Sequence, residues 1–217
     1  AEGKAIPKTD HDWTITETPA TCEKDGVRTY ICDVCHTTKS EPIKAIGHSY
    51  GAWTTTKEAT ISSKAEQQRT CSTCGKEEIT TYGEKLRPTI STNATSLKLK
   101  KKQTTKKFTV TGLAKGDYIT SWTSSNKKIV TVTGNQNGTC KIKAGSKTGK
   151  ATITIKLASG LTKQIKVTVQ KKAVTCSKIK NVPKTIKLKK KQTYQLKPVI
   201  NPITCTNKIK YKSSNKK

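Results

Sequence analysis

The residues best suited to chemistry in this chain are two pairs of cysteines, each pair separated by two residues. Cys32 and Cys35 form the first Cys-x-x-Cys pair, and Cys71 and Cys74 form the second. A turn of this kind presents two thiolates on one side, and two such turns commonly grip zinc in a tetrahedron. Zinc bound by these four cysteines is therefore one interpretation of the sequence.

The sequence leaves several uses of the pairs open. One site could hold all four thiols, although 35 residues lie between Cys35 and Cys71, a longer spacing than is typical of a zinc ribbon. Each pair could instead form its own site, completed by His11 in one case and His48 in the other. The rival interpretations are that each pair is oxidised to a disulfide or that the thiols are free. A redox-active pair is disfavoured, because nothing nearby suggests a βαβ unit.

Both pairs belong to a repeat, which we divide into residues 11–47 and 48–86, after a linker over residues 1–10. Thr- and Glu-rich alternating segments precede each pair, which predicts small β-hairpins with the cysteines at a turn. The spacing from Cys22 to Cys32 equals that from Ile61 to Cys71. The matching residues are His11 … Trp13 … Ala20-Thr21-Cys22 … Cys32 in the first unit and His48 … Trp53 … Ala59-Thr60-Ile61 … Cys71 in the second.

Units of about 37 residues cannot build a sufficient core and usually need a metal or disulfide staple. This favours a bonding role for the paired cysteines. Cys22 has Ile61 as its counterpart, so the repeat does not require a cysteine there, and His36, opposite Gly75, is expected at the surface. The units resemble short Cys-x-x-Cys repeats of secreted clostridial surface proteins.

Charge separates this half of the chain from the rest. Of the 43 Lys+Arg and 14 Asp+Glu residues, 11 and 13 lie in residues 1–86, which leaves 32 basic residues and only Asp117 in residues 87–217. Such asymmetry indicates separate domains and raises the question of a polyanionic partner, such as an anionic cell-wall polymer or a host glycan. The simpler interpretation is a solubilising surface. Nucleic acid is disfavoured, because Arg87 is the only arginine of the basic half.

The scarcity of acids also excludes several activities. Neither a calcium site nor paired-carboxylate glycoside hydrolysis can be built on the single acid of residues 87–217, and an internal Lys–Asn crosslink could use only Asp117. All three histidines lie before residue 87, and no Gly-x-Ser-x-Gly or His-Glu-x-x-His sequence is present. We predict that the chain is not an enzyme. No apolar stretch approaches the roughly 20 residues of a membrane-spanning helix.

The basic half reads as short strands separated by polar turns. Period-two alternation of Val, Ile, Thr and aromatic residues predicts a seven-stranded, antiparallel, immunoglobulin-like sandwich over residues 87–172, with Trp122 at its centre. The expected strands are 96–99, 107–110, 119–122, 129–132, 140–143, 151–155 and 164–169.

A second copy of this module begins after residue 172. Residues 98–104, KLKKKQT, return as 187–193, and residues 124–128, SSNKK, return as 213–217, both at an offset of 89. The fixed offset indicates tandem domains, places Tyr211 opposite Trp122, and suggests a piece of a longer repetitive protein. Residues 173–217 form an incomplete module, which we expect to be poorly ordered or to pair with its neighbour.

Two segments of the module, WTSSNKKIVTV (122–132) and AGSKTGKATITI (144–155), resemble the bacterial Ig-like domain, group 2. The resemblance covers about residues 89–172, with a partial second copy at 181–217. It implies an extracellular, wall-associated protein whose modules act as spacers or adhesion domains, with a host surface protein as one class of partner. The family carries no catalytic residues. An accessory role beside a secreted cell-wall or glycan-active enzyme is the alternative.

Three further cysteines, Cys140, Cys176 and Cys205, have no counterparts in the repeat. A bridge between Cys176 and Cys205 within the second module is one interpretation, and a buried or unpaired thiol is the other.

Overall fold

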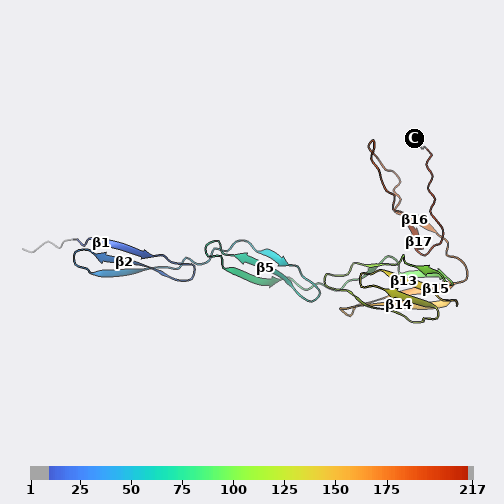
Figure 1. Ribbon diagram of the computed structural model, residues 1–217, viewed down its shortest axis with the longest axis horizontal. Coiled ribbons are helices and arrows are strands. Elements are labelled where there is room, and N and C mark those ends of the chain that lie inside the picture. The colour runs from blue at the N-terminus through green and yellow to red at the C-terminus, as the bar shows by residue number, and fades with distance from the viewer. Residues whose placement is uncertain (1–9, 215–217) are drawn as a thin grey trace, which may run out of the picture. The chain divides into compact units, whose positions relative to one another are not determined.

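The computed structural model describes residues 10–214, and all regular secondary structure in this range is β (Figure 1). The expected all-β class is therefore confirmed. The described residues fall into two compact units: one extends to residue 58 and includes 64–84, and the other contains 59–63 and the residues from 85 onward. Most of the expected linker and the last three residues of the second SSNKK sequence lie outside the described range.

The first unit contains two three-stranded antiparallel sheets, each with its strands in sequence order. A Cys-x-x-Cys sequence lies between the second and third strand of each sheet. The strands are β1 (Trp13–Thr18), β2 (Gly26–Cys32) and β3 (Thr38–Ile43) in one sheet, and β4 (Thr54–Lys57), β5 (Ala65–Thr70) and β6 (Glu77–Tyr82) in the other.

This first unit has almost no apolar interior. Among its described residues, the buried apolar side chains are Ala65 and the cysteines Cys22, Cys32 and Cys71. The sheets instead carry cation–π contacts on their surfaces, each contributing about 0.5–1 kcal/mol at exposed sites. The Lys39 ammonium lies over the rings of Trp13 and Tyr30, and the Arg69 guanidinium lies over Tyr50 and Trp53.

The strand register corrects one match of the repeat. Trp13 pairs with Cys32 in the first sheet, and Tyr50 forms the equivalent bridge to Cys71. Tyr50, two residues after His48, is therefore the counterpart of Trp13. Trp53 was matched wrongly because the second repeat has extra residues between this bridge and β4, where the register shifts again.

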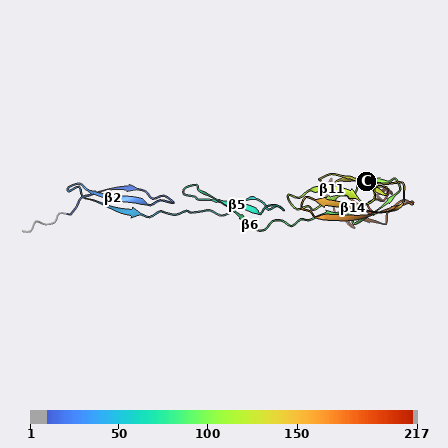
Figure 2. The same ribbon diagram turned by 90° about the horizontal axis from the view of Figure 1, so that it is seen from below.

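The second unit contains a β-sandwich. Its two sheets have the orders β11-β14-β15-β8 and β12-β13-β9, and Figure 2 shows β11 and β14 side by side. β7 and β10 form a separate two-stranded ladder. The strands are β7 (Ser91–Thr92), β8 (Ser96–Lys100), β9 (Thr104–Thr105), β10 (Val110–Thr111), β11 (Ile119–Ser124), β12 (Val130–Gly134), β13 (Cys140–Ala144), β14 (Gly149–Leu157) and β15 (Thr162–Gln170).

Two expectations about these strands were wrong. β8 and β15 are parallel, because they lie far apart in the sequence and no turn dictates their direction. Of the strand expected over residues 107–110, only Val110 lies in a strand, β10, and Thr109 forms an isolated bridge to Thr139. Phe108 lies between β9 and β10 and is fully buried. The chain therefore passes from one ladder to the other at a residue whose side chain packs in the core.

Alternate residues of both sheets form one core. In β14 and β15 every second residue from Ala151 to Leu157 and from Ile165 to Val169 is buried. Trp122 was expected at the centre, but it is only partly buried and packs against the core. Its indole lies against Gly134, where an added Cβ would overlap the ring, and the ring meets Phe108 edge-on.

Beyond the sandwich, residues 173–214 contain β16 (Lys178–Lys180) paired with β17 (Val199–Asn201). A disulfide joins Cys176 to Cys205, the bridge that the sequence left open. Ile203 belongs to the sandwich core cluster, and β16 and β17 form a sheet of their own. Tyr211 was placed in a core by analogy with Trp122, but it is 66% exposed. No helix in the described range could span a membrane.

Candidate metal centres

Each Cys-x-x-Cys sequence folds into the same tight turn. In the first turn the Cys35 N–H points to the Cys32 sulfur at 3.5 Å, and the His36 N–H donates to the Cys32 carbonyl at 2.9 Å. In the second turn the Gly75 N–H makes the equivalent bond to the Cys71 carbonyl, also at 2.9 Å. Both sequences therefore aim their two sulfurs toward one side of the turn.

The residue after each pair adopts a left-handed backbone conformation. Gly75 has φ of 74° and His36 has φ of 55°, which explains why a histidine aligns with a glycine in the repeat. His36 is exposed and belongs to neither cluster of metal-ligating groups in the described residues. Its position fits the surface role expected from the sequence.

The first cluster of potential ligands has four members, and we call it the four-ligand site. Cys22, His48, Cys71 and Cys74 place one ligating atom each within 4.8 Å of all the others. The sulfurs of Cys22 and Cys71 are 3.9 Å apart, and the Cys74 sulfur lies 3.4 Å from His48 Nδ1. This group could hold a metal ion.

Cys22 comes from the first repeat, whereas the other three ligands come from the second. It lies on a turn between β1 and β2, fixed by the Thr21 N–H donating to the Lys24 carbonyl at 2.9 Å. The repeat comparison missed this ligand, because a position filled by Ile61 in the other copy looked dispensable. The informative signal was a lone cysteine inside a turn that is otherwise shared.

The same turn also orients the histidine. His48 Nε2–H donates to the Glu23 carboxylate at 3.2 Å, and the Lys76 ammonium contacts the same oxygen. A proton on Nε2 leaves the Nδ1 lone pair free to face the sulfurs. A carboxylate behind a ligating imidazole is the usual way to fix its tautomer and raise its basicity.

The second cluster, the three-ligand site, contains His11, Cys32 and Cys35. His11 Nδ1 lies 3.4 Å from the Cys32 sulfur and 3.3 Å from the Cys35 sulfur. The two cysteine pairs thus occupy separate clusters, each with its own histidine. His11 and His48 are therefore both near the cysteine pair of their own repeat.

The surroundings of the sulfurs shift their acidities in opposite directions. The Cys35 backbone N–H is the largest influence on Cys32 and lowers the pKa of that thiol to about 6, with His11 also contributing. Burial opposes ionisation of Cys71, but the N–H groups of its turn and His48 outweigh it and lower the pKa to about 5. Burial and the neighbouring thiols raise the pKa of Cys22 to about 11. A cation among these sulfurs would favour the thiolate of Cys22 as well.

The remaining reactive groups have structural roles. The Cys140 thiol lies in the sandwich core near the Phe108 carbonyl, and burial raises its pKa to about 11, so it is an inert thiol. The Asp117 carboxylate accepts hydrogen bonds from the Ser159 backbone N–H at 3.2 Å and hydroxyl at 2.7 Å. It is thus engaged in holding two loops together.

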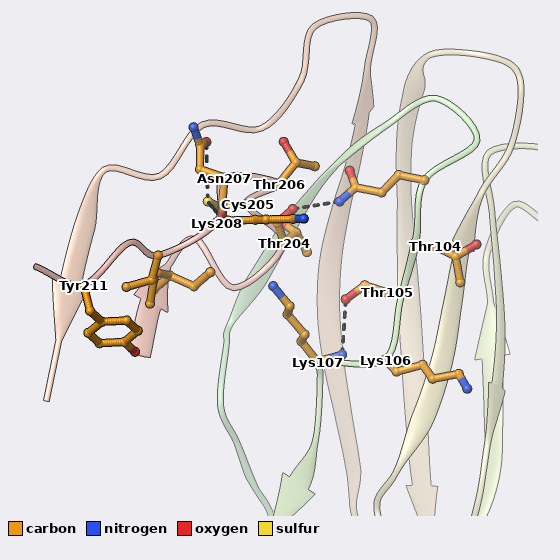
Figure 3. Close-up of a pocket in the computed structure, with 13 residues that line it drawn as sticks. Thr104, Thr105, Lys106, Lys107, Thr204, Cys205, Thr206, Asn207, Lys208 and Tyr211 are labelled. Atoms are coloured by element: carbon orange, nitrogen blue, oxygen red, sulfur yellow. Dashed lines mark hydrogen bonds between the residues drawn. The ribbon is translucent and has the colours of Figure 1, made fainter. Parts of the chain in front are cut away.

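A basic cavity of about 830 Å³ lies between residues 103–107 and 200–211. Figure 3 shows Lys107 and Lys208 extending into this space, with the hydroxyls of Thr105 and Thr206 nearby. Gln103 also lines the cavity, and its side-chain amide donates to the Thr204 carbonyl at 2.7 Å. Two ammonium groups beside hydroxyl and amide groups could contact an anionic ligand.

Neither a known protein family nor a curated protein matches the sequence of this chain.

Proposed function

We propose that this chain is part of an extracellular bacterial surface protein and serves as a structural spacer and adhesion segment, in which zinc ties two small repeats together. The observation that carries the proposal is the four-ligand site, because its ligands come from both repeats. A metal bound there would link Cys22 of the first repeat to His48, Cys71 and Cys74 of the second.

The spacings within the site suit zinc. With Zn–S distances of about 2.3 Å and Zn–N distances of about 2.1 Å, a tetrahedral site has S–S edges of about 3.8 Å and S–N edges of about 3.6 Å. The distances of 3.9 Å between the Cys22 and Cys71 sulfurs and 3.4 Å between Cys74 and His48 Nδ1 are close to these values. Thiolate-rich ligand sets favour zinc over hard cations.

A four-ligand zinc site is closed and therefore structural. Catalytic zinc keeps one position for water or substrate, whereas three sulfurs and one imidazole fill all positions here. This favours a scaffold role over hydrolysis. The sandwich in residues 87–172 supports the same role, and its resemblance to the bacterial Ig-like domain, group 2, is part of this proposal.

Metal analysis of the purified, full chain tests the zinc assignment. We expect native mass spectrometry to find zinc that survives a moderate chelator, and we expect Cys22→Ser to lose it. Cys140→Ala is the matched control, because it removes a thiol outside both clusters. Wild-type chain without zinc and with oxidised Cys-x-x-Cys pairs would refute the assignment.

The basic cavity favours a second function, the binding of an anionic cell-wall polymer or glycan as an accessory to an enzyme. Retention on heparin should fall steeply with rising salt. A Lys107→Gln/Lys208→Gln variant should elute at lower salt than a Lys127→Gln/Lys147→Gln control, which removes the same charge from exposed positions outside the cavity. Equal elution of the two variants would mean that only the general charge of the surface matters.

A further inference from the structure

Each repeat contains the same set of one histidine and two cysteines, and we call this set of potential ligands the receptor. His11, Cys32 and Cys35 correspond to His48, Cys71 and Cys74, and each histidine lies 3.3–3.4 Å from a sulfur of its pair. Both histidines also pack against the aromatic residue two positions later, with ring centroids 4.9 Å apart for Trp13 and 5.2 Å apart for Tyr50. The receptor is therefore a property of the repeat.

The fourth ligand comes on a separate element, which we call the donor turn (residues 21–24). In the first repeat, Thr21 N–H donates to the Lys24 carbonyl at 2.9 Å, and its hydroxyl accepts the Lys24 N–H at 3.0 Å. The corresponding turn of the second repeat has the same two bonds between Thr60 and Ser63, at 2.9 and 3.0 Å. The backbone of the donor turn is thus also a property of the repeat.

Only the side chains of the two turns differ. The first turn carries Cys22 and Glu23, which supply the sulfur ligand and the carboxylate behind the histidine, whereas the second carries Ile61 and Ser62. The Ile61 N–H donates to the carbonyl of Lys115, on a loop of the sandwich unit. The second turn therefore has no group with which to complete a metal site.

Each complete site thus needs a receptor from one repeat and a donor turn from another. The receptor of the first repeat has only three ligating groups among the described residues. Its His11 and Cys35 side chains are exposed, so an incoming turn can reach them. Cys22 cannot serve this receptor while it belongs to the four-ligand site.

We propose that the three-ligand site is the receptor half of a zinc joint, completed by the thiol of a Thr-Cys-Glu donor turn on a further copy of the repeat. The inference rests on the proposed zinc at the four-ligand site. The further copy is either another repeat of the same polypeptide or a repeat of a second chain, and the chemistry of the joint is the same in both cases.

The two receptors differ at the position of Lys76. In the four-ligand site its ammonium contacts Glu23 of the donor turn, but Thr37 occupies the equivalent place in the first receptor. Thr37 instead contacts the Cys35 sulfur through its hydroxyl at 3.2 Å. The first receptor thus accepts the donor thiol without an ammonium to pair with the accompanying carboxylate.

The test compares the full chain with an extended chain that has a copy of residues 10–47 inserted before Asp10. Native mass spectrometry in the presence of a moderate chelator reports zinc number and oligomeric state together. We expect one retained zinc in the full chain and two in the extended chain. Serine in place of the cysteine of the added donor turn should restore the count of one.

The outcomes separate the inference from the proposed function. If the full chain retains no zinc, the proposed function fails with it. If both chains retain one, or if the second zinc survives the serine substitution, the inference alone is overturned. A second zinc in a monomer would identify the same polypeptide as the source, and a second zinc found only in a dimer would identify a second chain.

Discussion

The sandwich and the cysteine repeats are both built from antiparallel strands, but they differ in what their strands bury. The sandwich unit contains a cluster of 18 buried residues, nearly all aliphatic. Among the described residues of the repeats, four apolar side chains are buried, and three of them are cysteines. The difference shows that the same local geometry can enclose an apolar core or carry clusters of potential metal ligands instead.

The reason lies in the number of layers. Each sandwich sheet has another sheet on one face, so alternate residues of β14 become buried. A single three-stranded sheet has no second layer, and five of the six residues of β1 are exposed. Small units of this kind usually depend on metals or disulfides, so the comparison can be tested by removing each source of stability separately.

Metal removal should have the largest effect, and only on the repeats. A strong zinc chelator should unfold residues 11–84 outright, because structural zinc supplies folding free energy directly. Hydrogen exchange should then show loss of amide protection in β1–β6, with β11–β15 unchanged. Protection that persists in β4–β6 after complete metal removal would contradict a zinc-dependent fold.

Ile153→Ala should destabilise the sandwich by about 2–5 kcal/mol, because it leaves a cavity in a closed core. Ile153 is fully buried. Thermal or denaturant unfolding should show the change in the sandwich transition, while the zinc content stays at its wild-type value. A parallel loss of zinc would mean that the two units do not fold independently.

Glu23→Gln should weaken zinc binding by about 10–100-fold without abolishing it, as expected for the loss of a carboxylate behind a ligating histidine. A chelator competition titration measures the change. Glu84→Gln is the matched control, because that exposed carboxylate pairs with Lys64 and does not contact a ligand. Equal affinities for the two variants would remove Glu23 from the site.

Ile15→Ala should have the smallest effect, within about 0.5 kcal/mol, because surface substitutions rarely change stability by more. Ile15 is 54% exposed on β1. The same substitution type would thus be costly in the sandwich and neutral in the repeats. A large change at Ile15, measured by hydrogen exchange of β1 and β2, would reveal an apolar contribution that the burial does not indicate.

The sequence predicted the parts of this protein that depend on local pattern. Period-two alternation located β8, β13, β14 and β15 closely, because alternate residues of each strand are buried. It failed at residues 107–110, where the chain changes ladders, and at Trp122, since pattern alone does not distinguish the centre of a core from its margin. The parallel pairing of β8 with β15 was missed because it joins distant segments.

The candidate site was predicted in part for the same reason. The Cys-x-x-Cys pairs are local signals with fixed spacing, and a histidine opens each repeat, so these residues could be named from the sequence. Cys22 and Glu23 could not, because they do not recur in the other repeat, which has Ile61 and Ser62 instead. A comparison of repeats finds the residues that both copies share, whereas Cys22 is present in only one of them.

The division of the four-ligand site between two repeats has a consequence for how such a protein could change length. The receptor of a duplicated repeat could bind the donor turn of the copy before it in the chain. Its own donor turn could complete the receptor of the copy after it, so a new joint would need no new ligands. Replacement of the donor cysteine, a change of one codon, is enough to end the series of joints. Where isoleucine replaces the donor cysteine, as at Ile61, the next segment must attach by other contacts, and a domain of a different kind can follow.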